Sequence, residues 1–309
     1  MTAGWVASTT RGRALLGRLV GADGARRLAV STSWPEARSD FATTLYGTDM
    51  APEADRVAAR TAAATATSWQ LRVLAGWCPP GATGLVRVFG APFELTNIMQ
   101  HVDHIDDHDA RREGSIPLGS LAVAWPHVAS TTTPDQVRTV LSHSPWGDPG
   151  GADAQTMRCG LRVSWCRRLV RQVPESKAWS HGALAVVIAG ERFGFGREIA
   201  GVTGRELDQE LGRSWRSANA ISDLVDRLPK PATWALVDVE KPEDLWLAEL
   251  ALVRRASAEA HLLVKRSRFD RTTVAAVMAL LLVDLWHVSA AIAVAGRQPM
   301  PMEVFDVVA

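Results

Sequence analysis

The chain is 309 residues long, enough to bury one sizeable hydrophobic core or two to three small ones. Its 34 lysines and arginines face 33 aspartates and glutamates, which gives a formal net charge of +1. This balance argues against a dedicated nucleic-acid or anionic-membrane protein, because neutralising phosphates requires clustered excess positive charge. The 3 cysteines form neither a paired framework nor a metal-spaced motif, and residues 1–5 do not open a secretory signal. We therefore expect a chain of the reduced cytoplasm.

The first third of the chain is predicted to be helical. Residues 10–21 set basic side chains beside an apolar stripe of helical period, which predicts an amphipathic helix. Residues 52–76 continue as an alanine-rich helix, which the prolines and glycine of residues 78–81 bring to an end. Helix resumes over residues 93–104, directly after Pro92.

The later elements are predicted to be helices separated by polar or glycine-rich stretches. The polar stretch 106–114 is the first domain boundary, a long helix covers residues 157–173, and the glycines of residues 194–204 mark a linker. The apolar run 274–296 is long enough to span a membrane, but Asp284 lies near its middle, and a mid-membrane aspartate costs about 2.5–3.5 kcal/mol. We predict a soluble core helix there. Because no segment alternates strongly enough for a sheet, the predicted fold is all-α.

One structural pattern occurs twice, 100 residues apart (33 to 133). Ser33 with Glu36, and Thr133 with Gln136, have capping-box spacing, in which a hydroxyl and a side chain three positions on satisfy each other's orphan backbone donors. Each pair is followed by apolar residues on one helical face, so each is predicted to begin an amphipathic helix.

The two capped helices are also predicted to end alike. Each leads to an aromatic residue and a glycine, Tyr46-Gly47 in the first and Trp146-Gly147 in the second, as expected where the chain turns through a left-handed C-terminal cap. We predict that the two aromatic side chains pack at the helix ends and do not stack on a ligand.

A second echo relates residues 179–190 to residues 285–296 and aligns a histidine in each segment. A unit of roughly one hundred residues is too long for a short-repeat solenoid and suits triplicated small helical domains. We therefore predict three similar helical domains, covering residues 1–113, 114–214 and 215–309, in a pseudo-threefold, funnel-like arrangement.

The segments that carry a family resemblance extend over most of the chain. They are residues 5–15, the helix ending at Tyr46-Gly47, residues 93–99, residues 118–147 and residues 286–297. Together they resemble the C-type central-stalk subunit of the vacuolar/archaeal-type (V/A-type) rotary ATPases, whose eukaryotic relative is the d-type subunit.

The chain departs from that family's pattern in its later units. Asn97 occupies a place where the family tends to have asparagine, whereas the aligned later positions hold His181 and His287. The third unit also lacks a clean capping box and an aromatic-glycine pair, which leaves its boundaries the least defined.

The resemblance implies a non-catalytic central-stalk rotor part. In the family, three similar helical domains surround a pseudo-threefold funnel that sits on the membrane ring of proteolipid subunits and receives the lower end of the central shaft. It implies rotor shaft subunits and the proteolipid ring as partners, and a cytoplasmic location peripheral to the cell membrane through the complex. It implies no nucleic acid, no membrane span of its own, no cofactor and no catalytic, cofactor-binding or metal-binding residues.

A different class of function is indicated by a histidine cluster. His101, His104 and His108 fall on one helical face with carboxylates beside them, and imidazoles at that spacing can hold zinc or another borderline metal. With Asp109 they would suit a metal-dependent helical hydrolase. The alternative is a solvated helix end that leads into a linker, and the metal content of the purified protein would separate the two.

Two further features bear on possible chemistry. The glycines near residue 196 lack the preceding strand and the Lys-Ser/Thr ending of a phosphate-binding loop, which predicts a plain linker. Asp284 and His287 lie one helical turn apart and are predicted to form a buried hydrogen-bonded pair.

Overall fold

The computed structural model describes residues 3–48, 50–107, 114–266 and 268–297. These residues are predominantly helical and contain no β-strand, which confirms the predicted all-α fold class. The longer helices are α1 (Ala3–Leu16), α4 (Arg56–Trp77), α5 (Thr83–Asp106), α8 (Ala154–Gln172), α9 (Lys177–Ala189), α13 (Leu245–Lys265) and α14 (Arg271–Val294). The shorter helices are α2 (Gly21–Ala29), α3 (Trp34–Ala42), α6 (Trp125–Val128), α7 (Pro134–Ser142), α10 (Gly201–Leu211), α11 (Ile221–Arg227) and α12 (Lys230–Thr233).

The helices form two compact units, and neither unit is continuous in sequence. Unit 1 comprises Met1–Phe93, Glu113–Leu121 and Ala256–Ala309, and unit 2 comprises Glu94–Arg112 and Ala122–Arg255. Two helices belong to both units, since α5 and α13 each contain a unit boundary. The division into three domains at residues 113 and 214 stays a prediction.

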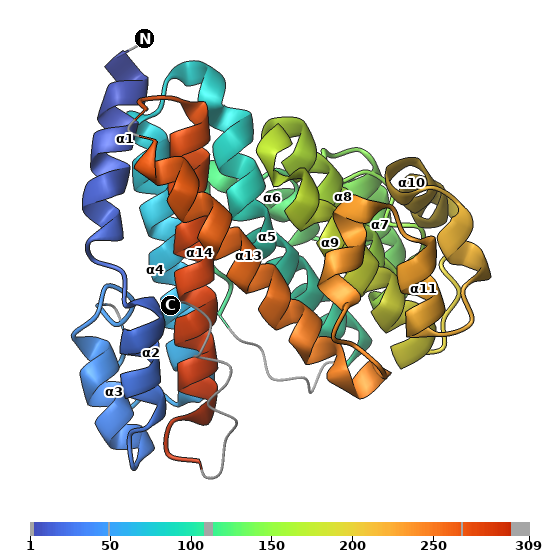
Figure 1. Cartoon of the computed structure of the whole chain (residues 1–309). Coiled ribbons are helices and arrows are strands. Elements are labelled where there is room, and N and C mark those ends of the chain that lie inside the picture. The colour runs from blue at the N-terminus through green and yellow to red at the C-terminus, as the bar shows by residue number, and fades with distance from the viewer. Residues whose placement is uncertain (1–2, 49, 108–113, 267, 298–309) are drawn as a thin grey trace. The chain divides into compact units, whose positions relative to one another are not determined.

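Unit 1 is built around α14. This helix is apolar on all sides and packs against α1, α2 and α4 (Figure 1). In the described part of the chain it is the one helix long and apolar enough to cross a membrane, and 67% of its most apolar window is buried inside the protein. A helix that is hydrophobic all round suits the centre of a bundle, because every face then meets another apolar surface.

Unit 2 has its core between α8, α9, α10 and α12, which pack on one another. Its apolar cluster contains fully buried side chains from each of these helices and from the segments between them, among them Val163, Leu184, Leu207 and Trp215. Close packing of large side chains is what gives such an interior its density and low compressibility.

The helix starts follow from local sequence. Ser33 and Thr133 are in extended conformation and accept hydrogen bonds from the backbone N–H groups of Glu36 and Gln136, which confirms the two predicted capping positions. The return bonds run to the residue before each cap, because the Glu36 carboxylate accepts from Thr32, and Gln136 accepts from the matching threonine before α7. Caps of this kind contribute about 0.5–2 kcal/mol each.

Three sequence predictions need correction. The helix predicted for residues 10–21 begins at Ala3 and ends at Leu16, and Gly21, with a left-handed φ of 69°, opens the next helix. The helix predicted to resume at residue 93 runs through Pro92 without a break. Apolar side chains before and after the proline are buried, Phe89 and Phe93 among them, so tertiary packing outweighs the local cost of a proline.

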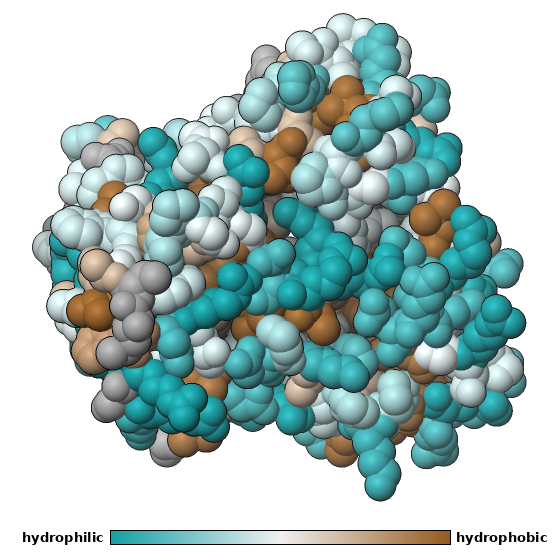
Figure 2. All heavy atoms as spheres, turned by 90° about the horizontal axis from the view of Figure 1, so that it is seen from above, coloured by the Kyte–Doolittle hydropathy of each residue, from teal (hydrophilic) through white to brown (hydrophobic). Residues whose placement is uncertain are grey.

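The third correction concerns the predicted glycine linker. Its first residue, Gly194, completes a π-helical turn, Gly190–Gly194, that continues directly from α9. The segment from Phe195 to Ala200 has no regular structure and leads into α10. On the face drawn in Figure 2, hydrophobic residues appear as separate groups among hydrophilic ones, as on the surfaces of most globular proteins.

Candidate functional site

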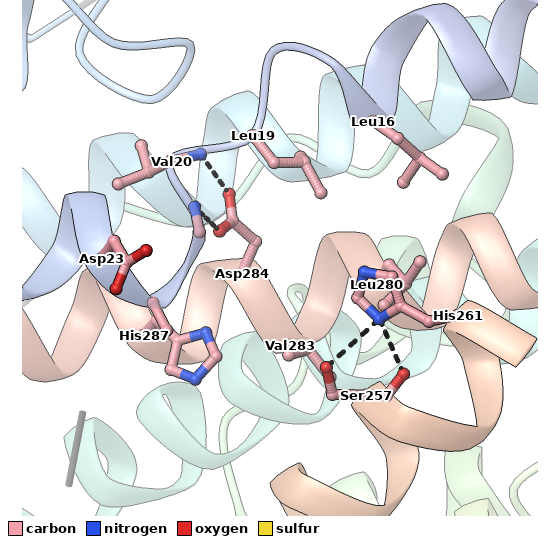
Figure 3. A pocket seen from close by; sticks show the side chains of 12 residues that line it. Leu16, Leu19, Val20, Asp23, Ser257, His261, Leu280, Val283, Asp284 and His287 are labelled. Carbon is pink, nitrogen blue, oxygen red and sulfur yellow. Dashed lines mark hydrogen bonds between the residues drawn. The ribbon is translucent and has the colours of Figure 1, made fainter. Parts of the chain in front are cut away.

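The first buried polar centre, in unit 1, is the carboxylate of Asp284 on α14. One oxygen accepts from the backbone N–H of Gly21 at 2.6 Å, and the other accepts from the backbone N–H of Val20 at 3.0 Å (Figure 3). The second oxygen also accepts from the hydroxyl of Tyr46. Asp284 is 2% exposed and Tyr46 is fully buried. A buried carboxylate is tolerated when its lone pairs are filled in this way.

The environment also changes the acidity of Tyr46. Burial of the phenol, followed by the adjacent charge of Asp284 and the hydrogen bond to it, raises the pKa of Tyr46 well above its ordinary value. The phenol therefore stays protonated and continues to donate to Asp284 over the whole physiological pH range.

Unit 2 contains a second buried carboxylate, Glu94 on α5. One oxygen accepts from three consecutive backbone N–H groups, those of Val123, Ala124 and Trp125, at 2.7, 2.7 and 2.8 Å. The other accepts from the indole N–H of Trp146 at 2.9 Å. Glu94 has no exposed surface. The chain segment that enters the short helix α6 is thereby attached to α5.

The two centres correspond to each other through the capped helices. Tyr46 follows α3, and Trp146 follows α7, at the same distance from the capping residues (13 positions in both cases). In each turn a hydroxyl two residues before the aromatic accepts a hydrogen bond from the aromatic's backbone N–H, Thr44 in the first and Ser144 in the second. The structure therefore supports the repeat in atomic detail over this segment.

The two aromatic side chains are more than packing anchors, since each donates the hydrogen bond that reaches the buried carboxylate. The predicted left-handed glycine is confirmed at Gly147, which has a φ of 75°, and is wrong at Gly47, which is not in the left-handed region. A Cβ on Gly47 would lie 2.3 Å from the carbonyl oxygen of Phe41. Glycine is therefore needed at position 47 for close backbone approach and at position 147 for its dihedral angle.

Helix α11 begins with the same backbone geometry as the two capped helices but without a side-chain cap, and sequence reasoning missed it. Ala220 takes the N-cap place with φ −150° and ψ 167°, close to the angles of Ser33 and Thr133. The carboxylate of Asp223 accepts from the backbone N–H of Asn219 at 3.0 Å, as Glu36 does from Thr32. Because alanine has no hydroxyl, the capping-box pattern is invisible in the sequence at this position.

The buried apolar positions continue that correspondence. Four and eight residues after the N-cap the three helices bury one apolar side chain each, and these are Ala37 and Phe41, Val137 and Leu141, and Leu224 and Leu228.

The carboxylates themselves share a position relative to the aligned residues of the repeat. Glu94 lies three residues before Asn97, and Asp284 lies three residues before His287. The same offset from His181 on α9 gives Ala178, so the third occurrence has no carboxylate there. This shared offset is the signal that could have identified Glu94 and Asp284 from sequence.

His287 does not form the predicted pair with Asp284. The carboxylate takes its hydrogen bonds from Val20, Gly21 and Tyr46, and the Nε2 atom of His287 has no hydrogen-bond partner in the described part of the chain. Burial lowers the pKa of His287, against a smaller opposing effect of Asp284. The imidazole of His287 is therefore neutral near pH 7. The one-turn spacing wrongly predicted a pair because the carboxylate of Asp284 accepts instead from backbone N–H groups of the α1–α2 connection.

A cavity of about 340 Å³ lies beside Asp284 in unit 1 (Figure 3). Apolar side chains such as Leu16 and Leu280 form one part of its wall, and Asp23 and His261 form a polar part. The Nδ1 atom of His261 lies 2.8 Å from the carbonyl oxygen of Ser257 on the preceding turn of α13. His287 also lines the cavity, and its Nε2 atom has no hydrogen-bond partner in the described part of the chain.

The predicted histidine cluster is only partly visible. The Nε2 atom of His101 is 3.1 Å from both the carbonyl and the hydroxyl oxygen of Thr131, and its ring meets Trp125 edge to face. His108 and Asp109 lie outside the described residues. Within the described ranges no group of three or more His, Cys, Asp or Glu side chains is arranged to hold a metal ion. The metal-dependent alternative therefore has no geometric support from His101 and His104.

Comparison with known proteins adds no identification. A scan against protein-family models and a search of the curated proteins both gave no match.

Proposed function

We propose that the chain is a non-catalytic central-stalk adaptor of a vacuolar/archaeal-type rotary ATPase, which couples the rotating shaft to the membrane proteolipid ring for ion transport. The observation that carries the proposal is the internal repeat. A capped helix, a turn with an aromatic donor and a buried carboxylate occur together twice. The start of α11 repeats the N-cap backbone angles and the return hydrogen bond, without the capping side chain.

A repeated helical body suits a torque-bearing part. Each buried carboxylate fastens a short-helix segment to a long helix of its own unit, through three hydrogen bonds at Asp284 and four at Glu94. Charge-assisted hydrogen bonds of this kind are roughly twice as strong as neutral ones. Dense apolar packing with such internal ties transmits strain with little deformation.

The three occurrences also support the finer architecture that the resemblance implies. In this proposal the segments that contain α3, α7 and α11 are the equivalent parts of three helical domains about a pseudo-threefold axis. The partners are the rotor shaft subunits and the proteolipid ring, and the protein is cytoplasmic and peripheral to the membrane through its complex. It contributes no catalytic residue of its own and needs no cofactor.

The test is co-purification from native membranes. The tagged chain, expressed at its native level, is isolated in mild detergent and the bound chains are identified by mass spectrometry, with the untagged strain as control. We expect a shaft subunit and a strongly hydrophobic proteolipid in fixed ratio to the tagged chain. Recovery of other partners without these two would instead favour a helical-repeat scaffold unrelated to rotary ATPases.

A second measurement addresses the non-catalytic role directly. The isolated chain is expected to be inert toward ATP and to contain no stoichiometric transition metal. ATP turnover by the homogeneous protein, or one tightly held zinc that is lost in a His101→Ala variant, would contradict the proposal.

A further inference from the structure

Unit 2 contains a second cavity of about 340 Å³, at the junction of the π-helical turn Gly190–Gly194 and the short 3-10 helix Ser214–Ser217. Three arginines line it, Arg192, Arg197 and Arg216, against a single carboxylate, that of Glu198. Such an excess of guanidinium groups on one concave surface attracts anions, because low-dielectric walls focus the field of the charges.

Two of the three arginines are held by carboxylates that do not line the cavity. Arg216 pairs with Asp208 at 2.8 Å, and Arg197 pairs with Asp153 at 2.9 Å and with Glu191 at 3.6 Å. These bonds fix the guanidinium groups in position. Among the residues that line the cavity itself, three arginines stand against one glutamate.

Arg192 differs from its neighbours because none of the described residues forms an ion pair with it. Its two terminal nitrogens donate to the backbone carbonyls of Trp215 and Ala218, the second at 2.8 Å. Arg192 is also the last of the groups that lower the pKa of Asp223, after the Asn219 hydrogen bond and Arg227. Its two hydrogen bonds cap the 3-10 helix through carbonyl oxygens and supply no carboxylate partner.

The aromatic side chain of Trp215 holds this arrangement together. The guanidinium carbon of Arg216 lies 4.6 Å from the centre of a Trp215 ring, and that of Arg192 lies 5.9 Å from it. The indole is 2% exposed, and its Nε1 atom has no hydrogen-bond partner among the described residues. Two guanidinium groups are thus oriented against one buried ring, which reduces the entropy that a ligand would have to remove.

The backbone beside the cavity is also unusual. A π-helical turn interrupts the end of α9, and Gly196 follows with a left-handed φ of 63° and open space where a side chain would point. Single π-turns of this kind occur frequently at functional sites.

We propose that this arginine-lined cavity is a binding site for a phosphate-type oxyanion, either free phosphate or the phosphate group of a monoester. A guanidinium group can donate to two oxygens of a phosphate at once, and Arg192, Arg197 and Arg216 line the same cavity. Glu198 limits the affinity by repulsion. This proposed anion site does not depend on the rotor function proposed above.

The experiment is calorimetric titration of the full chain with inorganic phosphate at constant ionic strength, with a chloride titration as reference. We expect saturable binding at one site. Arg192→Gln should weaken it by at least about tenfold, and Glu198→Gln should strengthen it several-fold, because the two changes alter the cavity charge in opposite directions. Arg205→Gln is the matched control, since Arg205 is exposed on α10 and lies outside the cavity.

A second titration uses a phosphate monoester, glycerol 3-phosphate, to separate the two sources of the anion. Equal affinity assigns the cavity to the free ion, and binding at least about tenfold tighter assigns it to a phosphorylated molecule. No saturable binding of either probe by the wild-type chain would overturn the proposal. Equal affinities in the Arg192→Gln and Glu198→Gln variants would also overturn it. Glu198→Gln keeps Arg192 and with it the cap on the 3-10 helix, so its affinity for phosphate reports the cavity charge in a folded protein.

Discussion

Units 1 and 2 build the same attachment from different residues. In unit 1 the shorter carboxylate side chain, Asp284, accepts from the hydroxyl of Tyr46. In unit 2 the longer one, Glu94, accepts from the indole N–H of Trp146. Both carboxylates also accept backbone N–H groups at the start of a short helix. What the two regions share is a buried negative charge surrounded by donors, and the identities of Asp284, Tyr46, Glu94 and Trp146 can differ because the geometry is the same.

The segment around α11 shows what is left when the carboxylate is absent. Ala178 replaces it at the matching offset, and the indole N–H of Trp234 donates to the carbonyl of Pro231 nearby. The 3-10 helix before Asn219 is held through its carbonyls, by Arg192, instead of through its N–H groups. A helix start of this kind is therefore compatible with attachment of the neighbouring segment through its N–H groups, as at Glu94 and Asp284, or through its carbonyl groups, as at Arg192.

The largest effect is expected from Glu94→Ala. Four donors in unit 2 would lose their acceptor, and leaving buried donors unsatisfied costs about 3–5 kcal/mol for the centre as a whole. The measurement is amide hydrogen exchange with urea unfolding. Exchange should accelerate at Val123, Ala124 and Trp125 and stay unchanged at Val20 and Gly21 of unit 1.

Asp284→Ala should give the reverse pattern at a smaller cost, since Asp284 accepts three hydrogen bonds and Glu94 accepts four. Exchange should accelerate at Val20 and Gly21 and stay unchanged at residues 123–125. Asp40→Ala is the control, because Asp40 is exposed on α3 and its change should stay within about 0.5 kcal/mol. Equal protection of all five amides in both variants would show that the carboxylates do not hold these segments.

Tyr46→Phe and Trp146→Phe sharpen the comparison at the donor side. Tyr46→Phe removes one hydroxyl and keeps the ring, so it should cost about 1–3 kcal/mol, the range for a buried hydrogen bond to a charged group. Trp146→Phe removes the indole N–H and also part of the ring, so it should cost more through the cavity left behind. Thermal unfolding of both variants tests the order, and a larger loss for Tyr46→Phe would contradict it.

The smallest effects concern the three N-caps. Ser33→Ala and Thr133→Ala should each destabilise by about 0.5–2 kcal/mol, because each removes the acceptor for an orphan backbone N–H. Ala220→Ser should stabilise by up to about 1 kcal/mol, since the backbone at Ala220 already has N-cap angles and lacks only the hydroxyl. Urea midpoints measure all three changes. No gain from Ala220→Ser would separate α11 from the other two helices.

The sequence allowed the local half of this arrangement to be predicted. A hydroxyl residue followed three positions later by Glu36 or Gln136 identified α3 and α7, because capping depends on neighbours within four positions. Asp284 was predicted to be buried and hydrogen-bonded, but with the wrong partner, and Glu94 was not identified. The reason is that their partners come from Val20, Gly21 and Tyr46 in one case and from residues 123–146 in the other. The helix start predicted after Pro92 was wrong for the same reason, since the packing that keeps α5 continuous involves distant side chains.

The most direct test of the buried carboxylate centres uses the fact that the chain has 1 tyrosine. Ultraviolet absorbance of tyrosinate therefore reports Tyr46 alone. Because the folded-state pKa of Tyr46 is raised above the ordinary value of 10.0, its contribution to stability is fully present below that pH and is lost as the pH rises toward the folded pKa. Circular dichroism in the same samples follows the fold.

We expect tyrosinate to form well above pH 10.0 in the wild-type chain and at a lower pH in Asp284→Asn. The variant should still titrate above the ordinary value, because burial is the main cause of the shift and the Asp284 charge is the second. Half-ionisation of Tyr46 near pH 10.0 in a fully folded wild-type chain, or an identical midpoint in Asp284→Asn, would contradict the buried Tyr46–Asp284 centre on which the repeat rests.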